Sequence, residues 1–173
     1  PSAPGQGTKL DAARAAAAAF VRRIDPAEDR AAIVAFNRTA RRVVPLTGDI
    51  DRLTLGLAAI ESAEGTLIDL GLAEATGALE GRRPAALAAV IVLTDGLQTM
   101  PPGNAAVVTE ADRLKASGAL VYAIGLGSTI DVALLAGVAS SPDRYFSSPT
   151  DAELTAIYDA ILARLACDQA TTP

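Results

Sequence analysis

Short apolar runs alternate with helical patterns along this chain. Three runs are apolar over nearly their whole length, at Ala31–Phe36, Ala88–Thr94 and Ala119–Gly127, and they predict strands that are buried on both faces. Apolar residues at helical spacing predict helices around them, over residues 10–24, 49–63, 68–79, 105–117, 131–138 and 151–165. This order predicts an α/β fold with a doubly wound, mostly parallel sheet and helices on both faces.

Two further segments complete the predicted sheet. Ala40–Thr47 follows the first buried run after a tight turn at residues 37–39, which predicts an antiparallel strand. Pro45 lies inside this segment and has no N–H to donate to a neighbouring strand, so the strand belongs at an edge of the sheet. Arg144–Ser148 predicts a short last strand.

Polar residues follow the predicted strands where a ligand would bind. In doubly wound folds, ligands bind outside the carboxyl ends of the strands. Asn37, Asp95 and the pair Gly127–Ser128 stand at such ends. A carboxylate directly after a buried strand loses water unless a cation or hydrogen-bond donors receive it, which favours a metal ligand or a catalytic acid at Asp95. The alternative is an ordinary turn, since Asp-Gly is a strong turn pair.

Thr66 has two interpretations that are compatible with each other. The stretch "TLID" from Thr66 to Asp69 fits a capping box, in which Thr66 is the N-cap of the following helix. A hydroxyl at this helix N-terminus also lies at the same edge of the sheet as Asp95. Thr66 is therefore a candidate ligand as well as a candidate cap.

Composition restricts the function classes. The 173 residues indicate one domain, over residues 1–166, and residues 167–173 look like the start of a C-terminal linker. The net charge of −5 argues against nucleic acid as a partner. The chain has no His, which excludes Ser-His-Asp and Cys-His catalysis, and the single Cys167 closes no disulfide within the chain. No apolar run approaches the roughly 20 residues of a membrane helix.

Several motifs in order resemble a known family. The chain is similar to a bacterial von Willebrand factor type A domain in the stretches "GTKLDAARAAAAAFV", "DRAAIVAFN", "VVPLTGD", "EGTLIDLGL", "VIVLTDGLQ", "VYAIGLGS" and "DRYFSSPTDAELTAIYDAI". The resemblance implies a metal-ion-dependent adhesion site that takes an Asp-x-Ser-x-Ser motif, a Thr and a second Asp. Thr66 matches the Thr and Asp95 the second Asp. Ser2 matches the last Ser by its spacing to Leu10, or is an ordinary serine near the chain end.

The sequence also departs from the family pattern. The first strand and the leading Asp-x-Ser are absent, and the chain opens on Pro1, so we expect a processed or truncated chain. In the family that strand lies between the strands matched here by Ala31–Phe36 and Ala88–Thr94. We therefore expect an empty lane between these two, about 9.6 Å across, that residues 1–9 do not fill. Because the lane exposes unpaired backbone groups, we expect the isolated chain to aggregate or stay partly molten.

The resemblance implies a non-enzymatic, metal-assisted protein-binding module of a larger bacterial protein, at the cell surface or outside the cell. Mg²⁺, or Mn²⁺ or Ca²⁺, would connect the domain to an Asp or Glu of a protein partner. Leu97 and Met100, apolar residues in the Pro/Gly-rich loop after Asp95, are expected at the partner-contacting rim or tucked under the loop. Two alternatives stay open: a Mg²⁺-dependent hydrolase or phosphotransfer domain using Asp95, and a structural domain with a non-functional metal site. The sequence leaves the oligomeric state open.

Overall fold

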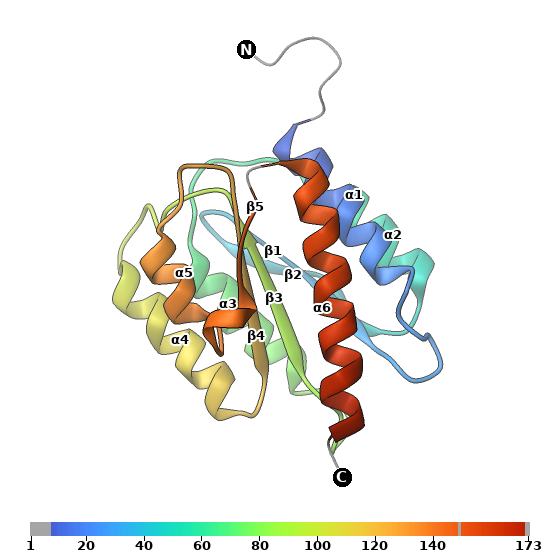
Figure 1. Cartoon of the computed structure of the whole chain (residues 1–173). Helices are drawn as coiled ribbons and strands as arrows, with labels where there is room; N and C mark the ends of the chain where they lie inside the picture. The colour runs from blue at the N-terminus through green and yellow to red at the C-terminus, as the bar shows by residue number, and fades with distance from the viewer. Residues whose placement is uncertain (1–7, 149, 172–173) are drawn as a thin grey trace.

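A computed structural model describes residues 8–148 and 150–171 and shows strands enclosed between two groups of helices (Figure 1). The strands are β1 (Ala31–Phe36), β2 (Ala40–Thr47), β3 (Ala89–Thr94), β4 (Leu120–Leu126) and β5 (Tyr145–Ser148). The helices are α1 (Lys9–Val21), α2 (Ile50–Ala58), α3 (Ile68–Leu79), α4 (Asn104–Ala116), α5 (Val132–Val138), the 3₁₀ turn η1 (Pro142–Arg144) and α6 (Asp151–Thr171).

The described strands form two separate sheets. β1 and β2 pair antiparallel, while β3, β4 and β5 form a parallel sheet in that order. Pro45 lies in β2, whose only partner in the described part of the chain is β1, so the predicted edge position is confirmed. The α/β class, the parallel sheet and the antiparallel edge strand therefore agree with the expectation.

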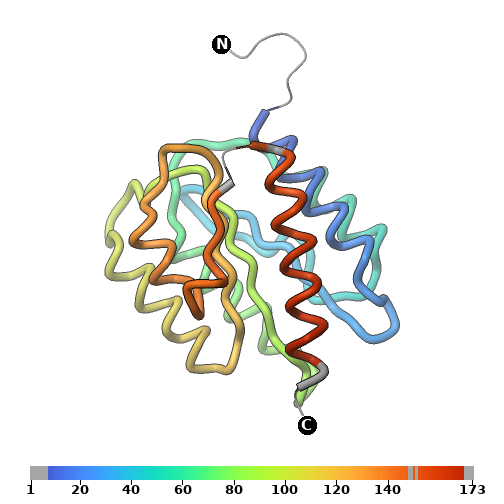
Figure 2. Tube along the Cα trace, in the orientation of Figure 1, coloured from blue at the N-terminus to red at the C-terminus, as the bar shows by residue number. Residues whose placement is uncertain are grey.

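The helices cover two opposite faces. Helices α3, α4 and α5 pack through one apolar cluster onto β3 and β4, and Ile68, Leu114, Leu135 and Val138 lie at its centre with at most 1% of their surface exposed. Helices α1 and α6 cover the other face of β4, and α1 and α2 cover β1 and β2. Figure 2 shows α6 running beside α1 along this second face. Both faces of β4 are thereby covered, as its apolar sequence predicted.

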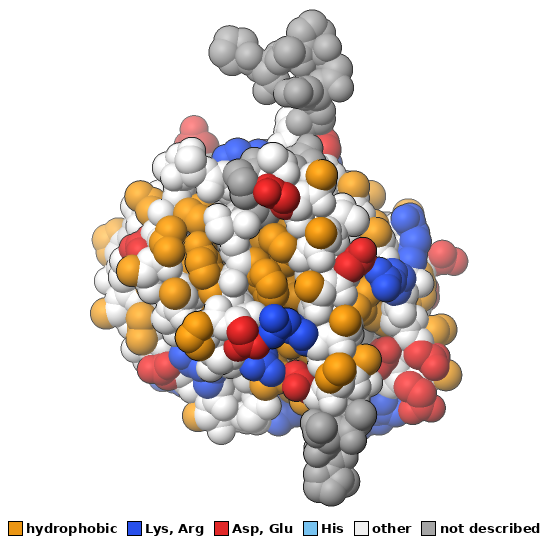
Figure 3. All heavy atoms as spheres, viewed as in Figure 1, with side chains coloured by type: hydrophobic (Ala, Val, Ile, Leu, Met, Phe, Trp, Pro, Cys, Tyr) orange, Lys and Arg blue, Asp and Glu red, His pale blue; other side chains and the backbone are white. Residues whose placement is uncertain are grey.

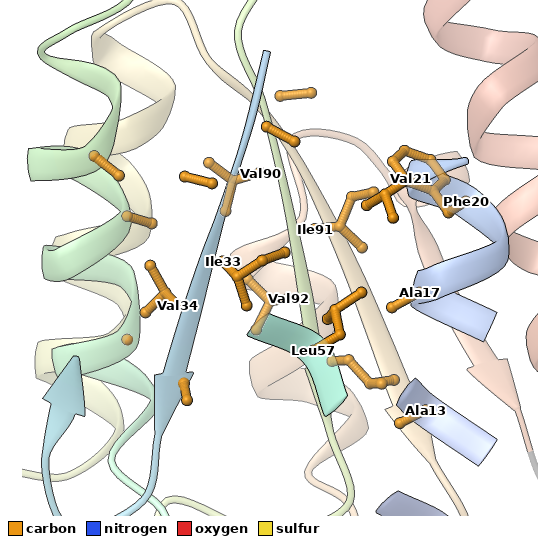
Figure 4. A pocket seen from close by; sticks show the side chains of 18 of the residues that line it. Ala13, Ala17, Phe20, Val21, Ile33, Val34, Leu57, Val90, Ile91 and Val92 are labelled. Atoms are coloured by element: carbon orange, nitrogen blue, oxygen red, sulfur yellow. The ribbon is translucent and has the colours of Figure 1, made fainter. Parts of the chain in front are cut away.

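The lane between β1 and β3 is open. No ladder joins these two strands in the described structure, and a cavity of about 2490 Å³ extends between them (Figure 4). Every residue of β1 is only partly buried, whereas β4, which has neighbours on both edges, is buried over six of its seven residues. The predicted empty lane is confirmed between the described strands. Lys9 begins α1, and residues 1–7 lie outside the described part of the chain.

Three predicted helix ends are wrong. The first helix ends at Val21, three residues before the predicted Ile24. The second helix ends at Ala58, five residues before the predicted Ala63, because the chain must turn back toward the carboxyl edge of the strands to place Thr66. The last helix continues to Thr171, so the predicted linker segment is helical over 167–171. No Gly or Pro interrupts these residues, and Arg144 Nη2 donates to Asp168 Oδ2 at 2.9 Å.

Charged and apolar groups both hold α6 in place. Arg164 of α6 forms an ion pair with Asp143 of η1, next to the bond between Arg144 and Asp168. Figure 3 shows apolar side chains gathered between α5 and α6, with a group of charged side chains below them. Phe146 of β5 packs in this region against the apolar cluster under α6. The last helix therefore belongs to the packed domain along much of its length.

Candidate metal-ion site at the carboxyl edge of the strands

The carboxyl ends of β1 and β3 meet at Thr66. Asn37, directly after β1, accepts a hydrogen bond through its carbonyl oxygen from Leu67 N–H at 2.8 Å. Gly96, two residues after β3, faces Thr66 so closely that a Cβ on it would lie 3.3 Å from the Thr66 Oγ1. The hydroxyl of Thr66 thus lies against the residue that follows Asp95. Larger side chains at position 96 would press on this hydroxyl.

Thr99 holds the backbone of Thr66. Thr66 N–H donates to Thr99 Oγ1 at 2.9 Å, and Thr99 N–H donates to the Thr66 carbonyl at 3.1 Å. These two bonds connect the loop after β3 to the segment before α3, 33 residues away in the sequence. Thr66 is therefore fixed in position by the loop that carries Asp95.

The predicted capping box at Thr66 is wrong. The N-cap position of α3 is Leu67, and no side chain of its own segment caps the helix. Gln98 does so instead: its Oε1 accepts from Ile68 N–H at 2.7 Å, and its Nε2 donates to Asp69 Oδ1 at 2.7 Å. Because the loop after β3 supplies the cap, the Thr66 hydroxyl makes no capping bond and stays at the sheet edge.

Asp95 is paired with a cation from α1. Lys9 Nζ lies 3.7 Å from Asp95 Oδ2, and both side chains are more than half exposed, at 51% and 60%. The same ammonium lies against the end of β4, since a Cβ on Gly127 would stand 2.9 Å from Lys9 Nζ. Such an exposed pair contributes about 0–1 kcal/mol to stability. Lys9 thus places an ammonium group in a weak, exposed ion pair with Asp95. A metal ion at this position would compete with that ammonium for the Asp95 carboxylate.

The described oxygens match a hard divalent cation in type but not in number. Mg²⁺ binds about six oxygens in an octahedron and keeps several waters. Asp95 and Thr66 offer one carboxylate and one hydroxyl at this edge, and the described residues contain no group of three His, Cys, Asp or Glu side chains that could hold a metal by themselves. Ser2, the third predicted ligand, lies outside the described residues. A metal here would need water or further ligands.

The loop after Asp95 presents one of its two apolar residues to solvent. Leu97 is 45% exposed beside the polar edge. Met100 is half-buried, and its carbonyl accepts from Gln98 Nε2 at 3.3 Å. Leu97 is therefore available to a partner, whereas Met100 fits the alternative that it packs partly under the loop.

Sequence reasoning missed three residues of this edge. Lys9 lies in the first turn of α1, and Gln98 and Thr99 lie in a loop with no regular pattern. The partners named above stand 29 or more residues away in the sequence, so no local spacing marks these three residues. The nearest signal was the polar character of the loop itself.

A comparison with protein families identifies the chain. The model of the von Willebrand factor type A domain matches residues 2–160. This chain belongs to that family. The match starts at the predicted ligand Ser2 and includes Thr66 and Asp95. A comparison with curated proteins found no match.

Solved structures of other proteins share the fold of this type A domain. Proximal thread matrix protein 1 from the mussel byssus, in a structure described as having a zinc-occupied MIDAS motif, has 24% identity and a TM-score of 0.79 over 91% of this chain and 40% of its own. The domain of the type V pili tip protein Mfa5 from Porphyromonas gingivalis has 16% identity and a TM-score of 0.82, covering 92% of this chain and 89% of its own. The pilus adhesin SpaC from Lactobacillus rhamnosus GG has 17% identity and a TM-score of 0.78, covering 91% and 28%. This chain thus spans less than half of the mussel protein and of the adhesin.

None of the helices in the described part of this type A domain is both long enough and apolar enough to cross a bilayer.

Proposed function

We propose that this type A domain is a protein-binding module that uses a divalent cation. Asp95 and Thr66 would hold the ion, with Ser2 as a third ligand, and an Asp or Glu of the partner would complete its coordination. The observation that carries the proposal is the placement of the Thr66 hydroxyl against Gly96, fixed by two hydrogen bonds to Thr99. A relative of the same fold is described with zinc in its MIDAS motif.

The chemistry of these ligands favours binding to an acidic partner. A bound ion would supply a positive centre that, held by a hydroxyl and few carboxylates, still attracts an anionic oxygen. Thr66 contributes a neutral oxygen in a fixed position, and Asp95 contributes the single negative charge. Leu97, exposed beside them, would contact the partner around the ion, with Met100 as a second contact. Mg²⁺ and Mn²⁺ are the ions that this oxygen set fits best.

The proposed location is the cell surface. The relatives of the same fold include a pilus tip protein and a pilus adhesin. A surface module that binds a protein through a cation would serve attachment, with no bond broken.

An enzyme using Asp95 is the rival function. It would need a second acid or a lysine at the same edge, and Lys9 stands there. Both side chains are more than half exposed, however. Charged groups stabilise a transition state more strongly in a site that excludes water. The geometry therefore favours binding over catalysis.

A metal titration tests the proposal. Isothermal titration of the chain with Mn²⁺ should show one saturable site, and Asp95→Ala should abolish it. Asp112→Ala is the matched control, because Asp112 is 63% exposed and pairs with Lys115 on α4. Binding that survives Asp95→Ala, or that is absent from the parent chain, would refute the metal mechanism and favour the structural alternative. Metal-dependent hydrolysis of a phosphate ester that is lost in Asp95→Ala would favour the enzyme.

A further inference from the structure

The parallel sheet has a free edge at β5. β5 pairs with β4, and no other strand in the described part of the chain pairs with its second side. Tyr145 packs with the cluster of α5 and Phe146 with the cluster of α6, so β5 lies between these two helices (Figure 1). Backbone N–H and C=O groups along such an edge are available to a further strand.

The outer edge of β2, at the other end of the fold, is protected against such pairing. Arg41 and Arg42 are exposed on β2, and the exposed Pro45 has no N–H to donate. The register between β1 and β2 is also irregular. β5 contains no charged residue and no proline, and its register with β4 is regular. Of these two edges, the one at β5 is therefore suited to accept a strand.

One side of α6 faces β5 and the free edge. Arg164 marks this side, because its guanidinium carbon lies 6.0 Å from the centre of the Phe146 ring in β5. α1 lies on a different side of α6, where Phe20 packs against Tyr158 with ring centroids 5.4 Å apart. The α6 side chains beside the free edge are therefore those that share a side with Arg164.

The Arg164 side of α6 is small in the middle and oppositely charged at its two ends. The residues that share this side at helical spacing are Glu153, Ala156 and Ala160, and all three are exposed. The Glu153 carboxylate accepts hydrogen bonds from Thr150 and forms no ion pair in the described structure. This pattern is complementary to itself when it is turned end for end. The alanines of two such helices then meet, and the acidic end of each meets the basic end of the other.

The α5 side of the free edge is apolar. Lys115 of α4 donates to the carbonyl of Gly137 at 2.9 Å, so α4 covers that side of α5. Val132 and Ala136 lie one turn apart on the side away from α4, and both are exposed, Val132 by 53%. Apolar side chains also gather between α5 and α6 on the surface (Figure 3). Both helices beside the edge thus present small or apolar side chains to an incoming chain.

We propose that two copies of this chain associate through β5 as a symmetric dimer. Antiparallel pairing of the two β5 strands joins the two three-stranded sheets into one and places α6 beside the α6 of the second copy. The two helices then lie about 9.6 Å apart, twice the strand spacing of about 4.8 Å, which is a normal helix packing distance. Ala156 and Ala160 leave room for this contact. Glu153 of each copy faces Arg164 of the other, whose guanidinium has donors beyond its pair with Asp143. The dimer needs no metal and stands apart from the function proposed for Asp95.

The alternation of side chains restricts the register of the two strands. Directly opposed residues of an antiparallel pair lie on the same face of a sheet, and Phe146 lies on the α6 face whereas Tyr145 lies on the α5 face. A two-fold axis at Phe146 pairs this residue with its own copy and Tyr145 with Ser147. An axis at Ser147 would instead pair Tyr145 with Pro149, which has no N–H to donate. The axis at Phe146 is therefore the one that we propose.

Sedimentation velocity in a reducing buffer, which excludes disulfides through the exposed Cys167, tests the association. The share of dimer should rise with the concentration of the chain. Ala160→Arg should weaken the association about tenfold or more, because a long charged side chain replaces a small one between the two α6 helices. Val132→Glu should weaken it several-fold. Ala15→Arg, exposed on α1, and Leu55→Glu, exposed on α2, are the matched controls and should leave it unchanged.

The charged ends of the α6 contact have a test of their own. Glu153→Gln should weaken the association about two- to fivefold at low salt, because it removes two exposed ion pairs from each dimer. High salt screens exposed charges, so the difference from the parent chain should disappear there. Equal association of the two chains at low salt would overturn this placement of α6.

Hydrogen exchange locates the interface. The amides of Tyr145–Ser147 should exchange more slowly as the concentration rises, while those of β2 should not change. A chain that stays monomeric at its highest soluble concentration would overturn the proposal and leave the edge to a strand of a different protein. Slower exchange in β2 alone, species larger than a dimer, or a dimer that both Ala160→Arg and Val132→Glu leave intact would overturn it as well.

Discussion

Gln98 is expected to hold the start of α3 and the loop after β3 together. Gln98→Ala removes the acceptor of Ile68 N–H and the donor to the Asp69 carboxylate, both at 2.7 Å. Asp69 is only 6% exposed, so water replaces the lost donor poorly. A hydrogen bond to a neutral group contributes about 0.5–1.5 kcal/mol and one to a charged group about 1.5–3 kcal/mol, which together give about 2–4 kcal/mol. Since 1.4 kcal/mol is a factor of ten, local opening should become about 30- to 1,000-fold more frequent.

Hydrogen exchange at the Ile68 amide measures this opening directly. Gln98→Glu keeps the acceptor but places a carboxylate against Asp69, so it should also accelerate the exchange. The double variant Gln98→Glu with Asp69→Asn reverses donor and acceptor and should restore slow exchange. Gln169→Ala, exposed on α6, is the control. Unchanged exchange at Ile68 in Gln98→Ala, or no rescue in the double variant, would refute the assignment of Gln98 as the cap.

Three other predictions follow from single contacts. Lys9→Ala should raise the affinity of the chain for Mn²⁺ about two- to fivefold in calorimetry, because it removes an exposed cation 3.7 Å from Asp95. Gly56→Ala should lower the free energy of unfolding by about 1–3 kcal/mol in urea titrations, because its Cβ would lie 2.2 Å from Val44 Cγ2. Burial raises the pKa of Tyr158 to about 12, so stability is full below about pH 10 and falls by about 1.4 kcal/mol per pH unit between about pH 10 and 12, as the unfolded chain loses the proton first. Tyr158→Phe should make this slope shallower in urea titrations at successive pH values, and Tyr122, whose pKa is also raised by burial, keeps part of it.

Each of these predictions has a control variant or an outcome that would contradict it. Arg113→Ala should leave Mn²⁺ affinity unchanged, and a lower affinity in the Lys9 variant would contradict competition for the carboxylate. Gly137→Ala, where a Cβ meets nothing within 4 Å, should stabilise α5 by about 0.5–1 kcal/mol, and the same gain at Gly56 would contradict the clash. An alkaline slope that is unchanged in Tyr158→Phe would assign the slope to another group.

The order and type of the elements could be predicted from local patterns. Continuous apolar runs predicted β1, β3 and β4, because a strand that is buried on both faces needs apolar residues at successive positions. Pro45 placed β2 at an edge, because its missing N–H leaves one ladder hydrogen bond unmade. The end of α2 at Ala58 could not be predicted, because no Gly or Pro directly follows it. It depends on the course of the chain from α2 to Thr66.

The sequence by itself determined that Asp95 stands at the end of a buried strand, because a strand's apolar length and its polar end are local features. Only the tertiary structure decided that Lys9 faces this carboxylate and that Gln98, in place of Thr66, caps α3. These contacts join residues 30 or more positions apart, and nothing in the local spacing records them. The sequence, with its family resemblance, also predicted the open lane between β1 and β3. The structure decided which contacts join the two sides of this lane. Leu67 N–H donates to the Asn37 carbonyl at one end, and Arg83 pairs with Glu28 at the other, because the packing of the two sheets against the helices brings these distant residues together.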